Sequence, residues 1–424
     1  MTGVLASAEI IAVGSEMLTP TRQDTNSLAI TGTLNELGIE VRAKAIVGDR
    51  HADLSAVFRG ALSRVDLVVL CGGLGPTDDD LTRDVVAAAL GRPLREDPTI
   101  TEAIRARFSR RNLTMPEINR RQAMVPEGAA VLANVHGTAP GLWIDHGAQV
   151  VVLLPGPPRE LAPMLEGDVR LRLSTRVCGD GLFTRVVRVF GRSESHTEDA
   201  VRPFYAAWAS AEPAIEVTIL AARGAIDLYL TARAATEADA SRRLNPAVGQ
   251  AVDALGDDVY SDRGQAIEEV TGALLRARGW QLAAAESCTG GLLLARLTEI
   301  AGSSDYIACG VVSYSNQSKI DLLGVDPALI ATHGAVSEPV AQAMAAGIRN
   351  RSGAHVGVAI TGIAGPGGGT DAKPVGTVAI ALDTPEGALV RTRRMIGDRD
   401  LIRAMAAHAA QDMLRRLLTG RQVP

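Results

Sequence analysis

The sequence predicts an α/β protein of two or three domains. Its 424 residues exceed the roughly 250 to 300 at which a single core usually stops growing. Short Val-, Ile-, Leu- and Ala-rich runs alternate with helical patterns over residues 1–175 and again over residues 262–424, which is typical of parallel sheets covered by helices. A content of 46% hydrophobic residues, 43 glycines and only 3% aromatic residues agrees with strands joined by glycine turns.

The first domain, residues 1–175, is expected to contain a mostly parallel sheet. Its expected strands are residues 9–13, 40–47, 66–71 and 149–154, and its expected helices are residues 26–37, 52–64, 81–90 and 99–111. Ligands of such sheets bind at the carboxyl ends of the strands.

The second domain, residues 180–258, is expected to be a small α+β unit. Its expected elements are strands at residues 184–190, 215–221 and 225–232, a hairpin turn at Arg223-Gly224 and a helix at residues 238–255. Ser195-His196-Thr197-Glu198 matches a capping box, which predicts another helix start. This domain carries no chemical motif, and the short polar stretch 256–264 after it is interpreted as a linker.

The third domain, residues 262–424, is predicted to be a separate α/β unit. Its expected helices are residues 266–278, 292–300 and 340–351, and its expected strands are residues 281–285, 307–314, 355–360 and 376–382. Ser337-Glu338-Pro339 predicts the start of the last helix, since proline is tolerated in a first turn.

Charge and cysteine content exclude several classes of function. The net charge of −5 argues against general nucleic-acid binding, because neutralising phosphates requires clustered Lys and Arg. The four cysteines are widely spaced without a C-x-x-C pair, which fits a reducing compartment. No signal-peptide pattern and no run of about 18 apolar residues is present. We therefore expect a cytoplasmic protein with no membrane partner and no direct nucleic-acid partner.

Two strands open abruptly into glycine. The strand at residues 355–360 continues into the glycine-rich residues 361–370, and the apolar run at residues 67–71 continues into residues 72–82. Glycine has no Cβ, so backbone N–H groups can approach an anionic ligand closely. Two such loops predict two active sites.

Hydroxyl and amine side chains gather at strand ends in the third domain. Ser287 follows one expected strand, Ser304 precedes the next, and Tyr314 and Lys319 follow that one. A lysine of lowered pKa can take the proton of a serine hydroxyl, and glycine-loop amides can stabilise the resulting oxyanion. This amide-cleaving chemistry needs no metal or other cofactor.

Each of these residues also has an ordinary structural interpretation. Ser287 can cap the following helix, Ser304 can belong to a turn, and Lys319 can be a solvated helix residue. Cys288 is another candidate nucleophile, although buried cysteines more often pack as small hydrophobic residues.

Four motifs of the third domain resemble the carboxy-terminal domain of the CinA family, the nicotinamide mononucleotide deamidases. They are Glu286-Ser287-Cys288-Thr289-Gly290-Gly291, Gly310-Val311-Val312-Ser313-Tyr314-Ser315-Asn316, His333-Gly334-Ala335-Val336-Ser337 and Thr361-Gly362-Ile363-Ala364-Gly365-Pro366-Gly367-Gly368. The resemblance implies hydrolysis of nicotinamide mononucleotide to nicotinate mononucleotide and ammonia. It implies roles for five residues: nucleophile Ser304, base Lys319, orienting hydroxyl Tyr314, and substrate or oxyanion contacts Ser287 and Thr361.

Further substrate contacts are expected around the same motifs. They are Thr289, Gly290, Gly362, Gly365 and Gly367. Arg399 and Arg403 fall where a phosphate clamp is expected, because a guanidinium donates two hydrogen bonds to phosphate at once. The alternative is that these arginines are ordinary charged residues at a helix start.

The glycine loop of the first domain combines amides with three carboxylates. Gly73, Gly75 and Thr77 can hold a phosphate, while a divalent cation can bind the acidic residues Asp78, Asp79, Asp80, Glu16 and Asp24. Acidic residues in a first helical turn are also common partners of the helix dipole, so each single aspartate has a structural alternative.

The first domain resembles the molybdopterin-binding fold and, more closely, the amino-terminal domain of full-length CinA proteins. The matching stretches are Val13-Gly14-Ser15-Glu16, Asp24-Thr25-Asn26, residues 72–82 and Leu154-Pro155-Gly156-Pro157-Pro158-Arg159-Glu160. The resemblance implies a KH-like second domain and a metal-dependent ADP-ribose pyrophosphatase that uses Mg or Co. Residues 18–23 depart from the family pattern, which usually has a glycine-containing stretch there.

The expected ligands are therefore nicotinamide mononucleotide and ADP-ribose, and the expected assembly is a homodimer. Two alternatives stay open. The first domain could bind molybdopterin or transfer an adenylyl group, or the chain could be a non-enzymatic accessory protein in competence or DNA recombination.

Overall fold

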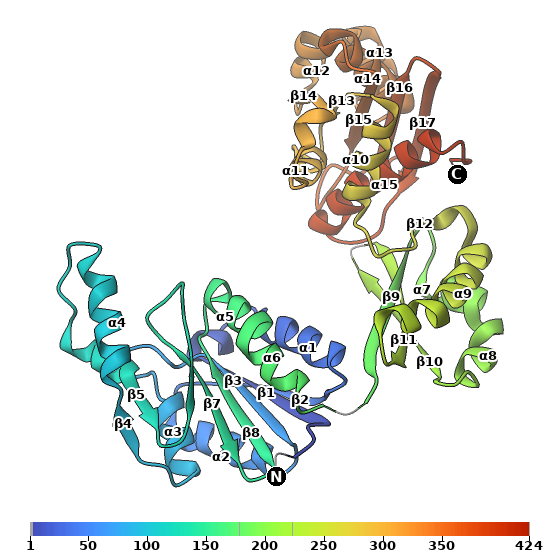
Figure 1. Ribbon diagram of the computed structural model, residues 1–424. Coiled ribbons are helices and arrows are strands. Elements are labelled where there is room, and N and C mark those ends of the chain that lie inside the picture. Colours follow the sequence, from blue (N-terminus) through green and yellow to red (C-terminus); the bar gives the residue numbers. More distant parts are fainter. Residues whose placement is uncertain (1–2, 178, 223, 424) are drawn as a thin grey trace. The chain divides into compact units, whose positions relative to one another are not determined.

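The computed structural model describes residues 3–177, 179–222 and 224–423, and the chain divides into two compact units (Figure 1). The first unit is mainly the first domain, and the second unit holds most of the second domain and all of the third. Cys178 and Arg223 of the predicted hairpin turn lie outside the described residues. No described helix combines the length and the apolar character needed to cross a bilayer.

The first domain contains a mixed six-stranded sheet, four strands of which are parallel as predicted. In sheet order the strands are β2 (Glu40–Val47), β1 (Ser7–Val13), β3 (Leu67–Cys71), β8 (Gln149–Leu154), β7 (Gly141–His146) and β6 (Ala130–Leu132). The two strands β7 and β6 are antiparallel. A separate ribbon pairs β4 (Leu94–Glu96) with β5 (Met124–Pro126).

Helices cover both faces of this sheet. One face packs against α1 (Asn26–Glu36), α5 (Pro158–Met164) and α6 (Arg170–Ser174), and the other against α2 (His51–Leu62) and α3 (Thr82–Ala89). Strand β1 is buried at all seven positions because it has apolar layers on both sides. Helix α4 (Pro98–Ser109) lies beside the β4–β5 ribbon (Figure 1).

The second domain has a four-stranded sheet in the order β10 (Ile215–Ala222), β11 (Ala225–Ala234), β9 (Gly181–Phe190) and β12 (Val259–Ser261). Its helices are α7 (Glu194–Val201), α8 (Tyr205–Ala209) and α9 (Glu237–Leu255). Two predictions are wrong here. The predicted linker contains the buried strand β12, and the hydroxyl that caps α7 belongs to Ser193, which accepts the His196 N–H, rather than to Ser195.

The third domain has a five-stranded sheet in the order β14 (Ile307–Val312), β13 (Leu282–Glu286), β15 (Val356–Gly362), β16 (Thr377–Thr384) and β17 (Gly387–Arg394). The first three strands are parallel and the last two antiparallel. One face packs against α10 (Ile267–Arg278), α11 (Leu292–Thr298) and α15 (Arg399–Leu418). The other packs against α12 (Asn316–Leu323), α13 (Pro327–His333) and α14 (Glu338–Ser352).

The second and third domains share one core. Phe190 and Tyr260 of the second domain contact the buried His408 of α15, with ring centroids 4.3 and 5.1 Å away. Next to them, the Asp412 carboxylate accepts hydrogen bonds from Arg415 and Arg416, and Arg416 also reaches Asp258 at 2.7 Å. The carboxyl-terminal half of α15 is therefore fixed to the second domain by buried charge as well as by apolar contacts.

Candidate active sites

Strand β13 and helix α12 bring Ser287 and Lys319 together. Ser287 is the first residue after β13, and its N–H donates to the Ile360 carbonyl of the neighbouring strand β15 at 2.9 Å. Lys319 lies in the first turn of α12, which Ser315 caps. The Lys319 ammonium lies 3.0 Å from the Ser287 hydroxyl oxygen and 2.8 Å from the Ser313 carbonyl oxygen. The two side chains form the amine–hydroxyl pair that serine–lysine chemistry requires.

The surroundings of Lys319 favour its neutral form. Only 1% of the residue is exposed, and burial lowers the pKa of its amine below the ordinary value. No carboxylate among the described residues forms an ion pair with it. A neutral amine can keep two N–H donors on the carbonyls of Ser313 and Tyr314 while its lone pair accepts the Ser287 proton.

Cys288 lies in the same pocket but is not a reactive thiolate. Burial is the main cause that raises the pKa of its thiol, to about 11, with the Glu286 carboxylate adding to the rise. The thiol is therefore protonated near pH 7, and thiols react as nucleophiles in the thiolate form. The hydrophobic interpretation of this cysteine agrees with its burial.

The glycine loop after β15 forms one wall of this pocket, whose volume is 270 Å³. Thr361 lines the pocket, and its hydroxyl donates to the Ala335 carbonyl at 2.9 Å. Within the described part of the chain, the backbone N–H groups of Gly365, Gly367 and Gly368 donate to no other protein group. The three glycines line the pocket, so their N–H groups are candidates for binding an oxyanion or a phosphate.

Ser304 lies at the other end of the sheet. Ser304 is exposed in a short 3-10 helix, Ser303–Asp305, which precedes β14. Ser287 and Lys319, in contrast, follow strands. Strand β14 is parallel to β13 and has six residues, so its two ends are about 20 Å apart. Ser304 neither lines the pocket nor contacts Lys319. The prediction of Ser304 as the partner of Lys319 is therefore wrong within one chain.

The predicted phosphate clamp divides into two parts. Arg399, at the first position of α15, lines the pocket and donates to the Gly365 carbonyl at 2.7 Å and to the Tyr314 hydroxyl at 3.0 Å. Arg403 lies one turn later and donates to the Thr289 carbonyl at 2.9 Å, outside the pocket lining. Arg399 therefore lines the pocket, whereas Arg403 supports the turn that carries Ser287.

Only some of the remaining predicted substrate contacts line the pocket. Gly362 lines the pocket, whereas Thr289 and Gly290 do not. Gly290 has a φ of +61°, so it serves the tight turn between β13 and α11. The Thr289 hydroxyl is fully buried without a hydrogen-bond partner among the described residues.

Sequence reasoning gave no role to Glu286, the last residue of β13. Its carboxylate is fully buried and accepts hydrogen bonds from the N–H groups of Gly291, Leu293 and Leu294 at 3.0 to 3.1 Å. Glu286 therefore caps α11 and fixes the turn that holds Ser287. An acidic residue just before a glycine pair and a helix could have indicated this role.

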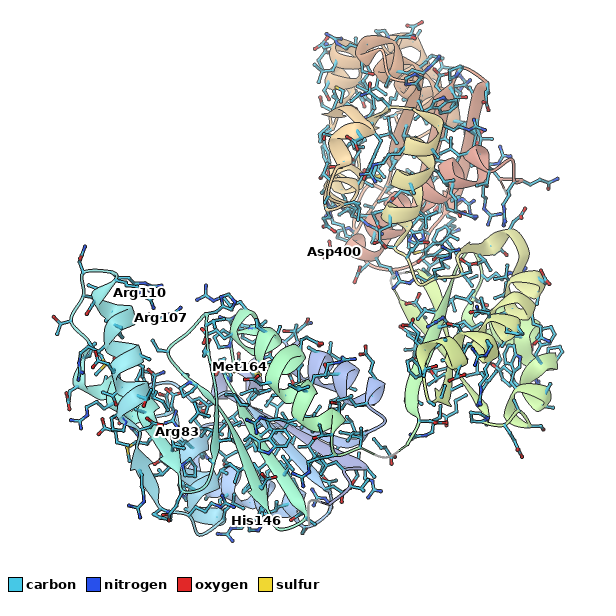
Figure 2. All side chains as sticks on the ribbon, in the orientation of Figure 1. Arg83, Arg107, Arg110, His146, Met164 and Asp400 are labelled. Carbon is cyan, nitrogen blue, oxygen red and sulfur yellow. The ribbon has the colours of Figure 1, made fainter. Side chains whose placement is uncertain are left out.

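The first domain has a larger pocket, with a volume of 680 Å³, at the carboxyl ends of β1, β3 and β8. Gly73 and Gly75 line it beside Glu16 and Asp79. The buried guanidinium of Arg83 on α3 supports the loop by donating to the Leu74 carbonyl at 2.9 Å. Figure 2 labels Arg83 in the first domain. The pocket is at the position at which parallel sheets bind ligands.

The predicted acidic set is only partly gathered there. Asp80 holds its own loop, because its carboxylate accepts the N–H groups of Gly75 and Thr77 at 2.7 and 2.9 Å. Asp78 is exposed and pairs with Arg121 at 2.6 Å. Asp24 caps α1 by accepting the Ser27 N–H at 3.0 Å. Thr77 also lies outside the pocket lining.

Glu16, Asp79 and Asp80 are the predicted metal ligands that line the pocket, and the carboxylate of Asp80 is occupied by its own loop. Asp49 and Glu160, which were not predicted as ligands, line it as well. No group of three or more His, Cys, Asp or Glu side chains in the described ranges is close enough to hold a metal by itself. Mg²⁺ in proteins commonly binds one or two carboxylates and completes its shell with water and substrate phosphates. The residues therefore fit a cation that binds together with a phosphate-bearing ligand, and not a preformed five-carboxylate site.

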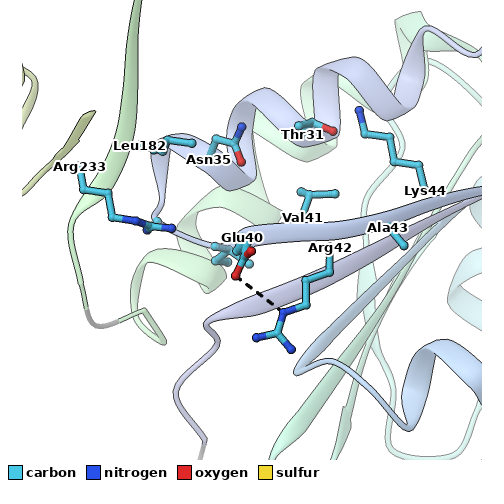
Figure 3. Close-up of a pocket in the computed structure, with 11 residues that line it drawn as sticks. Thr31, Asn35, Glu40, Val41, Arg42, Ala43, Lys44, Leu182 and Arg233 are labelled. Carbon is cyan, nitrogen blue, oxygen red and sulfur yellow. Dashed lines mark ion pairs between the residues drawn. The ribbon is translucent and has the colours of Figure 1, made fainter. Parts of the chain in front are cut away.

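A further hollow of 390 Å³ lies along the edge strand β2 (Figure 3). Arg42 and Glu40 form an ion pair of 3.7 Å beside it, and both side chains are exposed. None of the predicted site residues lines this hollow, and exposed ion pairs are common on protein surfaces.

Comparison with known proteins agrees with the three-part organisation. Residues 9–174 match the family model described as probable molybdopterin binding domain, residues 184–261 the damage-inducible protein CinA KH domain, and residues 264–418 the CinA C-terminal domain. A CinA-like protein of Acidobacterium capsulatum is 47% identical over 415 residues, which cover 97% of this chain and 99% of the relative. A putative competence-damage inducible protein of Symbiobacterium thermophilum is 45% identical over 425 residues, with the same two coverages.

A solved structure of a CinA superfamily protein from Klebsiella pneumoniae is 38% identical and covers 37% of this chain and 99% of its own, with a TM-score of 0.36. The family models together follow the three domains, and the relatives extend over almost the full length. This chain belongs to the CinA family, with a molybdopterin-binding-like first domain, a KH-type second domain and a CinA C-terminal domain.

Proposed function

We propose that the third domain hydrolyses the carboxamide of nicotinamide mononucleotide, giving nicotinate mononucleotide and ammonia. The observation that carries this proposal is the buried contact of 3.0 Å between the Lys319 amine and the Ser287 hydroxyl, in a pocket bordered by free glycine amides. Ser287 replaces Ser304 as the proposed nucleophile.

The proposed reaction has two halves. Ser287 Oγ attacks the carboxamide carbon while neutral Lys319 takes the hydroxyl proton, and Lys319 then gives that proton to the departing ammonia. Water, deprotonated by the same amine, attacks the resulting ester, and the proton returns to Ser287 as the acid leaves. The free amides of Gly365 and Gly367 are suited to the negative charge that develops on oxygen or to the substrate phosphate.

The direct test incubates chelator-treated protein with nicotinamide mononucleotide, separates the products and measures ammonia. We expect equal amounts of nicotinate mononucleotide and ammonia. The variant Ser287→Ala should lose turnover by about 10³-fold or more, whereas the matched variant Ser304→Ala should keep it. Loss in Ser304→Ala with turnover retained in Ser287→Ala would contradict the assignment and indicate that the nucleophile comes from another copy of the chain.

We also propose that the first domain hydrolyses the pyrophosphate bond of ADP-ribose with the help of a divalent cation. Its 680 Å³ pocket places Glu16 and Asp79 beside the glycine loop, which is the combination that a phosphate–metal ligand needs. A bound cation would supply charge neutralisation on the phosphates. The glycine loop would orient the pyrophosphate, and Asp80 would keep that loop in shape.

Asp79→Ala should lower metal-dependent release of AMP from ADP-ribose by at least about tenfold, because a carboxylate that lines the pocket beside the glycine loop is lost. Asp78→Ala is the control, since Asp78 is exposed and outside the pocket lining. Product analysis with Mg²⁺, with Co²⁺ and with chelator measures the effect. Equal rates in the two variants would remove Asp79 from the site, and binding of a pterin without ADP-ribose cleavage would favour a molybdopterin role.

The relative from Symbiobacterium thermophilum is named for competence and damage, and a non-enzymatic accessory role in DNA uptake or recombination is the alternative. The buried Ser287–Lys319 pair weighs against it. Burying an amine without an ion pair lowers the stability of a protein. A protein that only binds a partner has no need for a buried amine hydrogen-bonded to a serine hydroxyl, whereas a serine–lysine hydrolase does.

A further inference from the structure

Lysine is rare in this chain. Of 43 basic residues only Lys44, Lys319 and Lys373 are lysines, and all others are arginines. Two of the three lysines lie in the third domain at the border of the proposed amidase pocket. Lys319 has a role in the proposed reaction, whereas Lys373 has none so far.

The Lys373 ammonium joins two segments of backbone. It donates to the His333 carbonyl at 2.6 Å and to the Val336 carbonyl at 2.8 Å. Its own backbone is fixed by Thr370, whose hydroxyl accepts the Lys373 N–H at 3.1 Å and whose N–H donates to the Lys373 carbonyl at 2.9 Å. No ion pair links this ammonium to a carboxylate among the described residues. Its charge is therefore directed to the two carbonyls, one of which ends α13.

Both joined segments line the pocket. Residues 333–336 contribute Ala335 and Val336 to its lining, and the glycine loop that leads to Lys373 contributes residues 363–365, 367 and 368. A second hydrogen bond, from the Thr361 hydroxyl to the Ala335 carbonyl, also joins residues 333–336 to the end of β15, where the glycine loop begins. Arg399 holds the glycine loop from its other side, through the Gly365 carbonyl.

We propose that Lys373 is a positioning residue that clamps residues 333–336 to the glycine loop and so fixes the width of the substrate pocket. The consequence for catalysis rests on the proposed amidase function, whereas the clamp itself does not. The Lys373 ammonium packs closely against Gly334: a Cβ added at that glycine would lie only 3.3 Å from the Lys373 nitrogen. A compact ammonium fits this narrow space. A planar guanidinium needs more room and donates in a fixed fork.

The test uses the full-length chain and three variants: Lys373→Met, Lys373→Arg and the control Lys44→Met, which removes an exposed amine from the edge strand β2. Hydrogen–deuterium exchange should become at least about tenfold faster at the hydrogen-bonded amides of Gly334 and Thr370, one in each joined segment, in both Lys373 variants, and stay unchanged in Lys44→Met. With nicotinamide mononucleotide, KM should rise about tenfold while kcat changes by less than about threefold.

The two readouts separate the possible failures. Unchanged exchange in both segments would overturn the clamp, whatever the activity. A lower kcat at constant KM would place Lys373 in the chemical step and also overturn it. If the unmodified chain shows no amidase turnover, the proposed function fails, and the exchange data still decide the clamp. If Lys373→Met does not fold, Lys373→Arg decides, since it keeps the charge.

Discussion

Replacing Lys319 by alanine is expected to lower the rate of nicotinamide mononucleotide hydrolysis by about 10³-fold or more, with the fold intact. The reason is that the amine lies 3.0 Å from the Ser287 hydroxyl and would be the acceptor of its proton. Lys319→Arg should be equally inactive, because a guanidinium does not give up its proton near neutral pH. Product formation, with circular dichroism as the check on folding, measures both variants.

Two controls make this result specific. Lys44→Ala removes an exposed lysine from the first domain and should leave the amidase rate unchanged. ADP-ribose cleavage, if present, should be unaffected by Lys319→Ala, since the two pockets lie in different domains. Equal loss of both activities in Lys319→Ala would refute the model of two independent sites.

The pH profile of the unmodified chain should show the same base. Lys319 acts as a base only when neutral, so the rate should rise with pH and level off above the pKa of its amine. Burial lowers that pKa, so the plateau should begin below the ordinary lysine value of 10.5. A rate that still rises at pH 10.5 would show that another group is the base.

Asp412→Ala is expected to cost about 3 to 5 kcal/mol of stability in the second unit. Its carboxylate is 2% exposed and is shared by Arg415 and Arg416, each of them only 4% exposed in the side chain, so removing it leaves two buried guanidinium groups without this partner. The temperature of unfolding should fall by roughly 6 to 20 °C. Differential scanning calorimetry measures this fall.

Asp400→Ala is the matched control on the same helix, because its side chain is 91% exposed and lies 3.7 Å from Arg403 (Figure 2). It should change stability by less than about 0.5 kcal/mol. If Asp412→Ala is as stable as Asp400→Ala, the buried network makes no net contribution to folding.

Most of the architecture could be predicted from the sequence, because the spacing of apolar residues and the glycines of turns are local signals. Strands β1, β3, β13 and β15 were predicted within two residues at each end. Strand β12 was missed because three residues are too few to show an alternation of apolar and polar side chains. Strand β17 and helix α15 were missed because their charged residues interrupt the apolar pattern. Tertiary packing decided these elements.

The sites were predictable as regions and less so as individual residues. Lys319, Thr361 and Tyr314 were correctly expected to border one pocket, since they follow parallel strands. The sequence already places Ser304 before the strand that Lys319 follows, and six extended residues separate the two ends of that strand, so the pairing could have been rejected without the structure. The acidic set was overestimated because adjacent aspartates in a turn point in different directions, which the sequence does not show.

Helix α15 has a consequence for how the chain can be divided. Its amino end carries Arg399 and Arg403, which hold the pocket wall and the Ser287 turn, while its carboxyl end is fixed to Asp258 and β12 of the second domain. The family boundary between residues 261 and 264 therefore passes through a shared core. The chain matches three separate family modules, but its shared core is expected to make the last two unfold together. A cut between residues 261 and 264 would expose apolar and charged surface on both fragments.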